Sequence, residues 1–334
     1  MPHTLNLTSS PAASLLSLSH IRSVLQRLED TIVFQLIERA QFKLNRCMYL
    51  PGAFPELTKK EGWEGSWTEW FLKESESAHA KVRRWEAPDE YPFTPVELLP
   101  SPILPAVEYP PLLWPSNNNH GINVNSKIYS FYVENIVPAI CSRHKVEGGA
   151  EDAESDDESD DGQYGSAAVR DVEILSALSR RIHFGMFVSE SKFRSAPSDF
   201  VPHIITASST SPSVTAEQKT VARDKLLALI TKPAVEAALL VRLAEKAQVY
   251  GGDFDAAFQA RNSGMAREQQ EKEREKRRKI EVDEVVQLYK GFVIPLTKTV
   301  EVDYLEKRLE GLSESQVRAL ADGKSWEDVA QELK

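Results

Sequence analysis

Cysteine is scarce in this chain. Only two of the 334 residues are cysteines, Cys47 and Cys141, and neither belongs to a motif, so a disulfide framework and a zinc site are not expected. No apolar run approaches the roughly 18 residues that a membrane-spanning helix needs. The N-terminal residues lack a basic stretch followed by an apolar one, which argues against a secretory signal and favours a cytoplasmic protein.

Motifs of cofactor chemistry are also missing. The chain has no phosphate-binding loop, dinucleotide fingerprint, metal cluster or arrangement typical of a catalytic triad, so we expect no cofactor and no metal. The formal net charge is −10, but nine of the acidic residues lie between Glu147 and Asp161 with no basic residue among them. The rest of the chain is therefore close to neutral, which gives no support to nucleic-acid binding.

The chain does contain a series of helical patterns. Apolar residues recur at intervals of three and four, and no segment alternates with the period of two that a half-buried strand shows. Ser17 and Ser19 are suitable N-caps for the first pattern. These observations predict an all-α, single-domain helical bundle. The expected helices begin near residue 17 and continue near 66–86, 124–145 (with a kink at Pro138), 166–193, 215–229, 233–249, 281–311 and 315–333.

Three stretches do not fit the helical pattern. Residues 1–16 have the composition of a disordered tail. Residues 88–115 contain nine of the 19 prolines and should cross the body as extended chain. The acidic, low-complexity segment 146–163 cannot bury a core, so we expect a surface loop inserted into the domain.

The main domain is expected to span 17–312. Within it, the alternating charges of 267–281 are typical of an exposed helix with ion pairs between its turns. A helical extension, 313–334, should follow, because Ser313 and Gln316 form a capping-box pattern.

Spacing alone offers a few chemical candidates. Arg181 and Lys192 lie eleven residues apart, about three helical turns, so they project from nearly the same face. Most charged pairs at helical spacing are solvated surface, and His183 is more typical of a packing residue than of a catalyst. The pattern therefore indicates a helical protein without assigning it a reaction. Two further pairs stand four residues apart, Lys232 with Glu236 and Thr297 with Glu301.

Five blocks of the sequence resemble fungal chorismate mutases and occur in that family's order over roughly residues 17–312. The most specific block is GSAAVRDVEILSALSRRIHFGMFVSESKF (165–193). The others are SHIRSVLQRLEDTIVFQLIERAQF (19–42), AHAKVRRWEAPDEYPF (78–93), PAVEAALLVRLAEKAQVYG (233–251) and VIPLTKTVEVDYLEKRLE (293–310). The resemblance implies an all-helical homodimer that rearranges chorismate to prephenate, in phenylalanine and tyrosine biosynthesis, without a cofactor.

The resemblance also implies a set of site residues. Arginines suit the two carboxylates of chorismate, since a guanidinium binds a carboxylate through two hydrogen bonds. Lysine and a protonated glutamate suit the ether oxygen, on which negative charge develops as its bond breaks. The lysine at 232 stands where the family has an asparagine, which changes charge and geometry. The implied catalytic residues are Arg22, Arg181, Lys192 and Glu301, and the implied substrate-binding residues are Lys232, Glu236 and Thr297.

A second set of residues matches the family's effector site, where tyrosine inhibits and tryptophan activates at a dimer interface. It comprises Arg83, Arg84, Gly165, Ser166 and Val169. Backbone N–H groups at the start of a helix suit the effector's carboxylate. Val169 stands where the family has a threonine that helps to bind the tyrosine hydroxyl, so we expect weak or no inhibition by tyrosine. Tryptophan is still expected as an effector.

Two alternatives are compatible with the same sequence. The first is a catalytically silent helical homologue that serves as a regulatory or scaffold partner, which the retention of six functional residues disfavours. The second is a secreted mutase that acts on a host's chorismate, which the missing signal disfavours. Turnover of chorismate tests the first, and fractionation between cells and medium tests the second.

Overall fold

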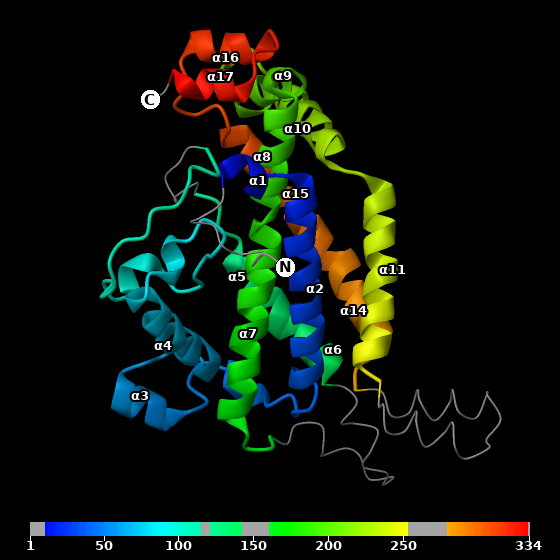
Figure 1. The fold of residues 1–334 in the computed structure, drawn as a ribbon. Helices are drawn as coiled ribbons and strands as arrows, with labels where there is room; N and C mark the ends of the chain where they lie inside the picture. Colours follow the sequence, from blue (N-terminus) through cyan, green and yellow to red (C-terminus); the bar gives the residue numbers. More distant parts are fainter. Residues whose placement is uncertain (1–10, 115–120, 142–159, 253–278, 333–334) are drawn as a thin grey trace, which may run out of the picture.

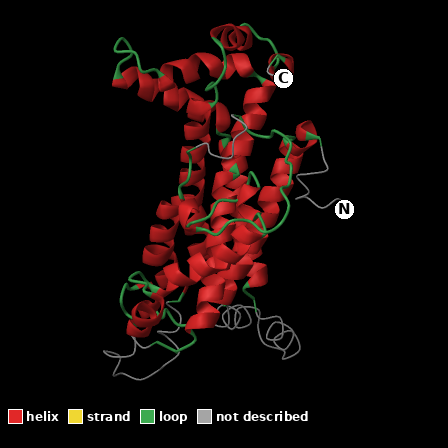
Figure 2. Cartoon of the chain, turned by 90° about the vertical axis from the view of Figure 1, so that its left-hand side faces the viewer, coloured by secondary structure: helices red, strands yellow, loops and turns green. Residues whose placement is uncertain are grey.

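The structure is a computed structural model that describes residues 11–114, 121–141, 160–252 and 279–332. Helices and loops make up these ranges, with no strand among them, which confirms the predicted all-α bundle. Figure 1 shows α2, α7 and α11 side by side, and Figure 2 shows the helices gathered along one long axis. None of the described helices is both long and apolar enough to cross a membrane.

Helix α2 (Leu18–Arg39) begins at the predicted cap. The Ser17 hydroxyl accepts a hydrogen bond from the His20 backbone N–H at 3.3 Å, which satisfies one of the free N–H groups at the start of the helix. The apolar stripe of α2 packs against α7 and α11. Its buried members follow the predicted spacing: Ile21, Val24, Leu28, Ile32 and Leu36.

The single helix expected over 166–193 is instead two consecutive helices, α7 (Tyr164–His183) and α8 (Gly185–Ser195). The chain tightens between them, because the Phe187 N–H donates to the Phe184 carbonyl at 3.1 Å in a three-residue turn. The two helices follow one another along the length of the bundle (Figure 1).

A glycine at the start of α8 permits close contact with α15 (Ile294–Lys307). A Cβ atom at Gly185 would lie 2.9 Å from the Cγ of Glu301 and 3.0 Å from the Cγ2 of Thr297. Side chains do not tolerate such distances, so glycine is what lets these helices pack this closely.

Two of the expected long helices contain a π-helical turn. Each turn lies next to a proline, Pro138 or Pro295, whose missing N–H interrupts the regular α-helical hydrogen bonds. Near Pro138, where a kink was expected, the structure has the π turn Tyr132–Ile136. The segments are α5 (Asn125–Phe131), the π turn Tyr132–Ile136 and α6 (Val137–Ile140), then α14 (Val282–Leu288), the π turn Tyr289–Val293 and α15.

Between α2 and α5, the chain forms short elements around one amphipathic helix. That helix, α4, opens with a capping box between Ser66 and Glu69. Residues 88–114 run extended as expected, apart from η3, and their buried Leu112 and Leu113 join the core. The elements are η1 (Arg46–Tyr49), α3 (Pro55–Glu61), α4 (Trp67–Lys81), η2 (Arg84–Glu86) and η3 (Val96–Leu98).

The expectation of a disordered tail over 1–16 was wrong for its last residues. Helix α1 (Ala12–Leu15) lies there, and Leu15 and Leu16 are buried at 4% and 5% exposure. Burial of these two leucines compensates for ordering a stretch that is otherwise rich in serine and proline. Residues 1–10 lie outside the described part of the chain, as do 146–159 of the acidic segment and 267–278 of the charged segment.

Helix α9 (Pro197–Ser208) was not predicted, because Pro202 lies inside it and disguises the pattern. The two helices that follow, α10 (Ala216–Ile230) and α11 (Pro233–Tyr250), have nearly the expected bounds. Helix α9 packs on α10 and α15, so this group forms a second apolar core beside the main one.

The C-terminal extension is docked on this second core. It holds two short helices, α16 (Glu314–Ala321) and α17 (Trp326–Gln331), where one helix was expected over 315–333. Gly323 turns the chain between them with a φ of 94°, a conformation that favours glycine. The predicted capping box starts α16.

Candidate active site

One cavity brings together all seven residues that were assigned to catalysis and substrate binding. Its volume is about 160 Å³, and it lies between α2, α7, α8, α11 and α15. The residues come from helices far apart in the sequence, so only the folded bundle makes them neighbours. The seven are Arg22, Arg181, Lys192, Lys232, Glu236, Thr297 and Glu301.

Arg181 is the most buried cation of the cavity. Its residue exposure is 5%, and its Nε atom is buried with no hydrogen-bond partner among the described residues. A buried donor without an acceptor costs about 1–3 kcal/mol. A ligand oxygen that accepted this hydrogen bond would remove that cost, so the cavity is built to receive an acceptor at Arg181.

Lys192 enters the cavity from α8. Its ammonium donates to the Ile230 carbonyl at the end of α10. Burial lowers the pKa of Lys192, the nearby Glu301 opposes that change, and the charges of Lys232 and Arg22 add to it. The amine is thus held by one backbone acceptor, with donors left over for a ligand.

Glu301 faces Lys192 from α15 and is 8% exposed. Burial raises the pKa of Glu301 to about 8, although the charges of Lys192 and Arg181 act in the opposite direction. Below that pH the carboxyl group keeps its proton, so it can donate a hydrogen bond to a ligand oxygen. Thr297, one turn earlier on α15, donates its own hydroxyl to the Val293 carbonyl at 2.6 Å.

Lys298 is a cavity residue that the sequence reasoning missed. Its ammonium lies 2.8 Å from the carboxylate of Glu236, so α15 and α11 are joined across the cavity. The spacing of residues in the sequence gave no signal that distinguishes Lys298 from a solvent-exposed lysine. Thr231, at the end of α10, was also missed; its buried hydroxyl has no hydrogen-bond partner in the described part of the chain.

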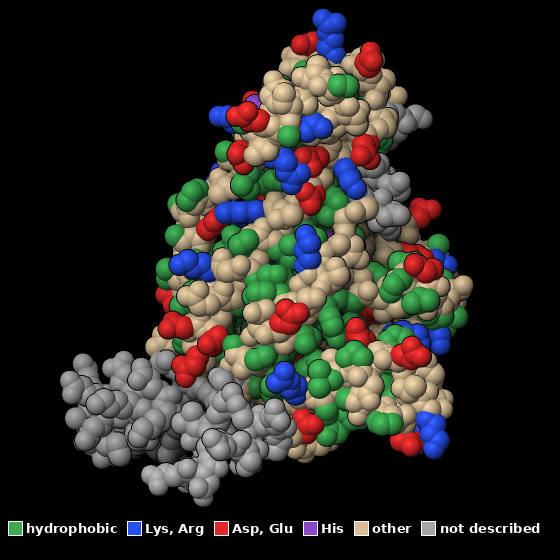
Figure 3. Space-filling view, turned by 180° about the vertical axis from the view of Figure 1, so that it is seen from behind, with side chains coloured by type: hydrophobic (Ala, Val, Ile, Leu, Met, Phe, Trp, Pro, Cys, Tyr) green, Lys and Arg blue, Asp and Glu red, His purple; other side chains and the backbone are tan. Residues whose placement is uncertain are grey.

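The cavity carries an excess of positive charge. Five of its lining residues are basic and two are acidic, and one of the acidic residues, Glu301, keeps its proton at neutral pH because its pKa is raised to about 8. The face shown in Figure 3 has a different character, because basic and acidic side chains are interspersed over it. A small anion with more than one carboxylate therefore fits the cavity. The basic residues are Arg22, Arg181, Lys192, Lys232 and Lys298.

The residues assigned to an effector site are not brought together within one copy of the chain. Arg84 lies after α4 and donates to Glu90 at 2.9 Å and to the Ser176 hydroxyl at 2.7 Å. Ser176 is eleven residues beyond Gly165, about 16 Å along α7 at 1.5 Å per residue. The arginine half of the predicted site therefore lies beside the middle of α7, whereas Gly165 and Ser166 lie at the start of that helix.

The individual effector residues differ in their availability. Arg83 has a left-handed backbone, with a φ of 63°, and pairs with Glu86 and the Leu104 carbonyl. Gly165 and Ser166 are exposed in the first turn of α7. Val169 follows on the same helix and is 38% exposed.

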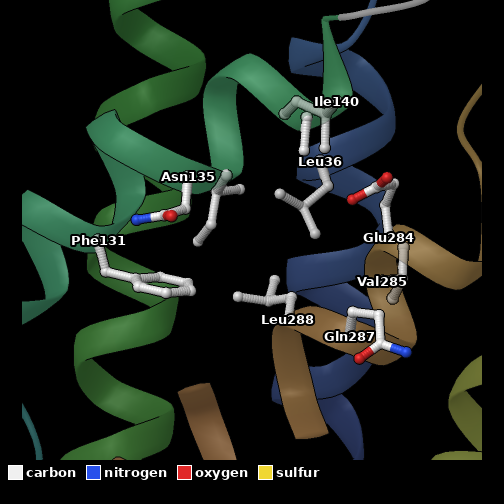
Figure 4. A pocket seen from close by; sticks show the side chains of 10 residues that line it. Leu36, Phe131, Asn135, Ile140, Glu284, Val285, Gln287 and Leu288 are labelled. Carbon is white, nitrogen blue, oxygen red and sulfur yellow. The ribbon is translucent and has the colours of Figure 1, made fainter. Parts of the chain in front are cut away.

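Two other cavities contain none of the predicted residues. One, of about 180 Å³, lies between α2, α14 and the α5–α6 segment, where Leu36, Phe131 and Leu288 face a common hollow (Figure 4). Another, of about 480 Å³, lies beside α4 and α5 and is lined by Trp63, Phe93 and other side chains. The first is mainly apolar, and neither gathers basic groups as the central cavity does.

Comparison with known proteins gives a consistent result, although no family model matches the chain. The chain is 42% identical over 302 residues to the chorismate mutase of Emericella nidulans, covering 90% of this chain and 96% of that protein. It is 37% identical over 297 residues to the chorismate mutase of Saccharomyces cerevisiae, covering 89% and 97%.

Solved structures agree with these relatives. The chorismate mutase of Candida albicans in complex with L-Trp superposes with a TM-score of 0.72 at 35% identity, covering 92% of this chain and 97% of that one. A structure of the chorismate mutase AtCM1 with tyrosine bound in its allosteric site gives a TM-score of 0.65 at 35% identity, covering 88% and 97%.

Proposed function

The chain belongs to the chorismate mutase family, and we propose that it converts chorismate to prephenate in the cavity between α2, α7, α8, α11 and α15. The observation that carries this proposal is the convergence of seven separately assigned polar residues on one cavity. The reaction is intramolecular: the ether carbon–oxygen bond breaks while a carbon–carbon bond forms. What the protein must supply is the compact conformer of the substrate and stabilisation of the developing charge.

The two carboxylates of chorismate are assigned to Arg22 and Arg181. Arg181 is buried with an unpartnered Nε, whereas Arg22 is exposed at the edge of the cavity. One carboxylate is therefore held deep in the site and the other near its mouth. Fixing both ends brings the reacting carbons together, which is catalysis by orientation.

The ether oxygen is assigned to Lys192 and Glu301, which lie on opposite helices α8 and α15. Lys192 donates as a cation, and Glu301 donates as a neutral carboxyl group below a pH of about 8. Both donors are in place before the bond breaks, so they stabilise the charge without reorganisation. An ionised Glu301 would instead repel the oxygen.

The substrate hydroxyl is assigned to Glu236. Its carboxylate is already oriented by the Lys298 ammonium at 2.8 Å and can accept a hydrogen bond from that hydroxyl. Lys232, four residues earlier, is exposed at the mouth and adds a positive charge. We infer that this charge contributes to the attraction of the dicarboxylate in place of a directed amide hydrogen bond.

Regulation is proposed to require two copies of the chain. The structure from Candida albicans is a complex with L-Trp, and the AtCM1 structure has tyrosine bound in its allosteric site. Arg83 and Arg84 lie too far from Gly165 and Ser166 to bind one amino acid within one copy, whereas a homodimer could pair the two halves. The exposed Val169 beside this helix terminus offers no hydrogen bond to a tyrosine hydroxyl.

Loss of chorismate absorbance with purified protein tests the proposed function. Arg181→Ala should lower kcat/KM by about 100- to 1,000-fold, because it removes a buried charged donor. Arg170→Ala is the matched control, since Arg170 lies on the same helix but outside the cavity and should keep nearly full activity. A folded wild-type protein without turnover would contradict the proposal and favour the silent homologue.

A further inference from the structure

A fully buried ion pair joins α15 to α8 outside the cavity. Arg308, directly after α15, donates to Glu190 of α8 through Nη2 at 3.0 Å and also through Nε, and both side chains are 0% exposed. The same carboxylate accepts from Arg194 at 2.6 Å and from the Tyr304 hydroxyl at 2.8 Å. Glu190 lies two residues before Lys192, so this cluster fixes the part of α8 that reaches the cavity.

The C-terminal extension covers this cluster with one side chain. Trp326, the first residue of α17, is 4% exposed. The centroid of its ring lies 3.9 Å from the guanidinium carbon of Arg308. The ring of Phe193 lies 4.3 Å from the same carbon. Arg308 Nη1 has no hydrogen-bond partner among the described residues, so aromatic faces stabilise the cation where water does not. Trp114 packs edge-on against Trp326 at 5.5 Å.

The strength of the ion pair depends on the exclusion of water. Burial alone would raise the pKa of Glu190, but the charges of Arg308 and Arg194 outweigh burial and lower it, so the carboxylate is ionised. Charges attract strongly in a dry environment and weakly in water. Removal of the Trp326 ring would admit water to Arg308 and loosen its hold on Glu190.

We propose that the C-terminal extension positions the active site: Trp326 keeps the Arg308–Glu190 pair dry, and that pair sets the position of Lys192 relative to Glu301. The inference rests on the proposed function, since it assigns both of those groups to the ether oxygen. Trp326 is a positioning residue, because it contacts neither the cavity nor the substrate.

Three contacts hold α8 against α15 under this proposal. They are the close approach at Gly185, the hydrogen bond from the Ser189 hydroxyl to the Glu301 carbonyl at 3.0 Å, and the Glu190 cluster. Lys192 lies beyond the last of these contacts, so loosening the Glu190 cluster allows the amine to move. Arg22 and Arg181 lie on other helices and keep their hold on the carboxylates. The effect should therefore fall on kcat more than on KM.

Full-length Trp326→Ala, Trp326→Phe and Trp326→Leu variants test the proposal, with Glu327→Ala as the exposed neighbour control. The alanine variant should lose about 10- to 100-fold in kcat with KM changed by less than about 3-fold, a loss in the range that small misplacements cause. Its kcat/KM should also begin to fall at a lower pH than in wild type, because water entering between α8 and α15 would lower the pKa of Glu301.

The conservative variants separate positioning from packing. Phenylalanine keeps an aromatic face and should restore most of kcat, whereas leucine fills space without that face and should not. This comparison decides the question even if the alanine variant does not fold. Folded alanine or leucine variants with the kcat and pH profile of wild type would overturn the proposal. Lack of turnover by wild type would instead overturn the proposed function.

Discussion

At the scale of residues, Glu301 combines a cost in stability with a role in chemistry. Burial raises its pKa from the usual 4.5 to about 8, in spite of the neighbouring cations. The folded protein therefore binds a proton between pH 4.5 and 8 that the unfolded chain does not bind. The contribution of Glu301 to the free energy of unfolding therefore falls as the pH rises through this window.

A Glu301→Gln variant should lose this pH-dependent cost. One pKa unit corresponds to about 1.4 kcal/mol, so the variant should gain on the order of 4 kcal/mol of stability over wild type between pH 5 and pH 9. Denaturant unfolding of both proteins at the two pH values measures the difference, and subtraction cancels the titration of other groups. An equal stability difference at both pH values would show that Glu301 titrates normally.

Resemblance predicted more of the site than spacing did. Spacing placed Arg181 and Lys192 on one helix face, but it could not show that Arg22 and Glu301 share a cavity with them. Lys298 and Thr231 were missed, because a lysine and a threonine on a helix carry no signal of burial or pairing until neighbouring helices are in place.

At the scale of elements, periodicity predicted the long helices and failed where proline interrupts a helix. The apolar stripe of α2 and its Ser17 cap were correct because both are local features. Helix α9 was missed because Pro202 is tolerated there by packing against α10 and α15. Long-range packing likewise orders α1, whose composition alone favours disorder.

The boundary between α7 and α8 shows a further limit of sequence patterns. The apolar stripe continues across it, so one helix was expected over 166–193. The pattern contains no information on the position of α15. A Cβ atom at Gly185 would lie within 3.0 Å of the side chains of Glu301 and Thr297 on that helix. The need for glycine there arises from the partner helix.

At the scale of the whole molecule, the effector site proposed to form between two copies of the chain should respond to one substitution on α7. Val169→Thr should strengthen inhibition by tyrosine at least about 10-fold, because the new hydroxyl gives the ligand's hydroxyl a partner. Val221→Thr is the matched control. It changes an exposed valine on a different helix, α10, and should leave the response to tyrosine unchanged. Inhibition constants for tyrosine measure the effect, and equal constants in all three proteins would exclude Val169 from the site.

The most direct test of the account is the pH dependence of kcat/KM for wild type and Glu301→Gln with chorismate. The free enzyme's ionisations govern this quantity, so wild-type activity should fall as the pH rises past about 8, where Glu301 loses its proton. The glutamine variant keeps a donor at that position and should retain activity without that alkaline fall. A glutamine variant that is folded but inactive at every pH, or one with the same alkaline fall as wild type, would contradict the account.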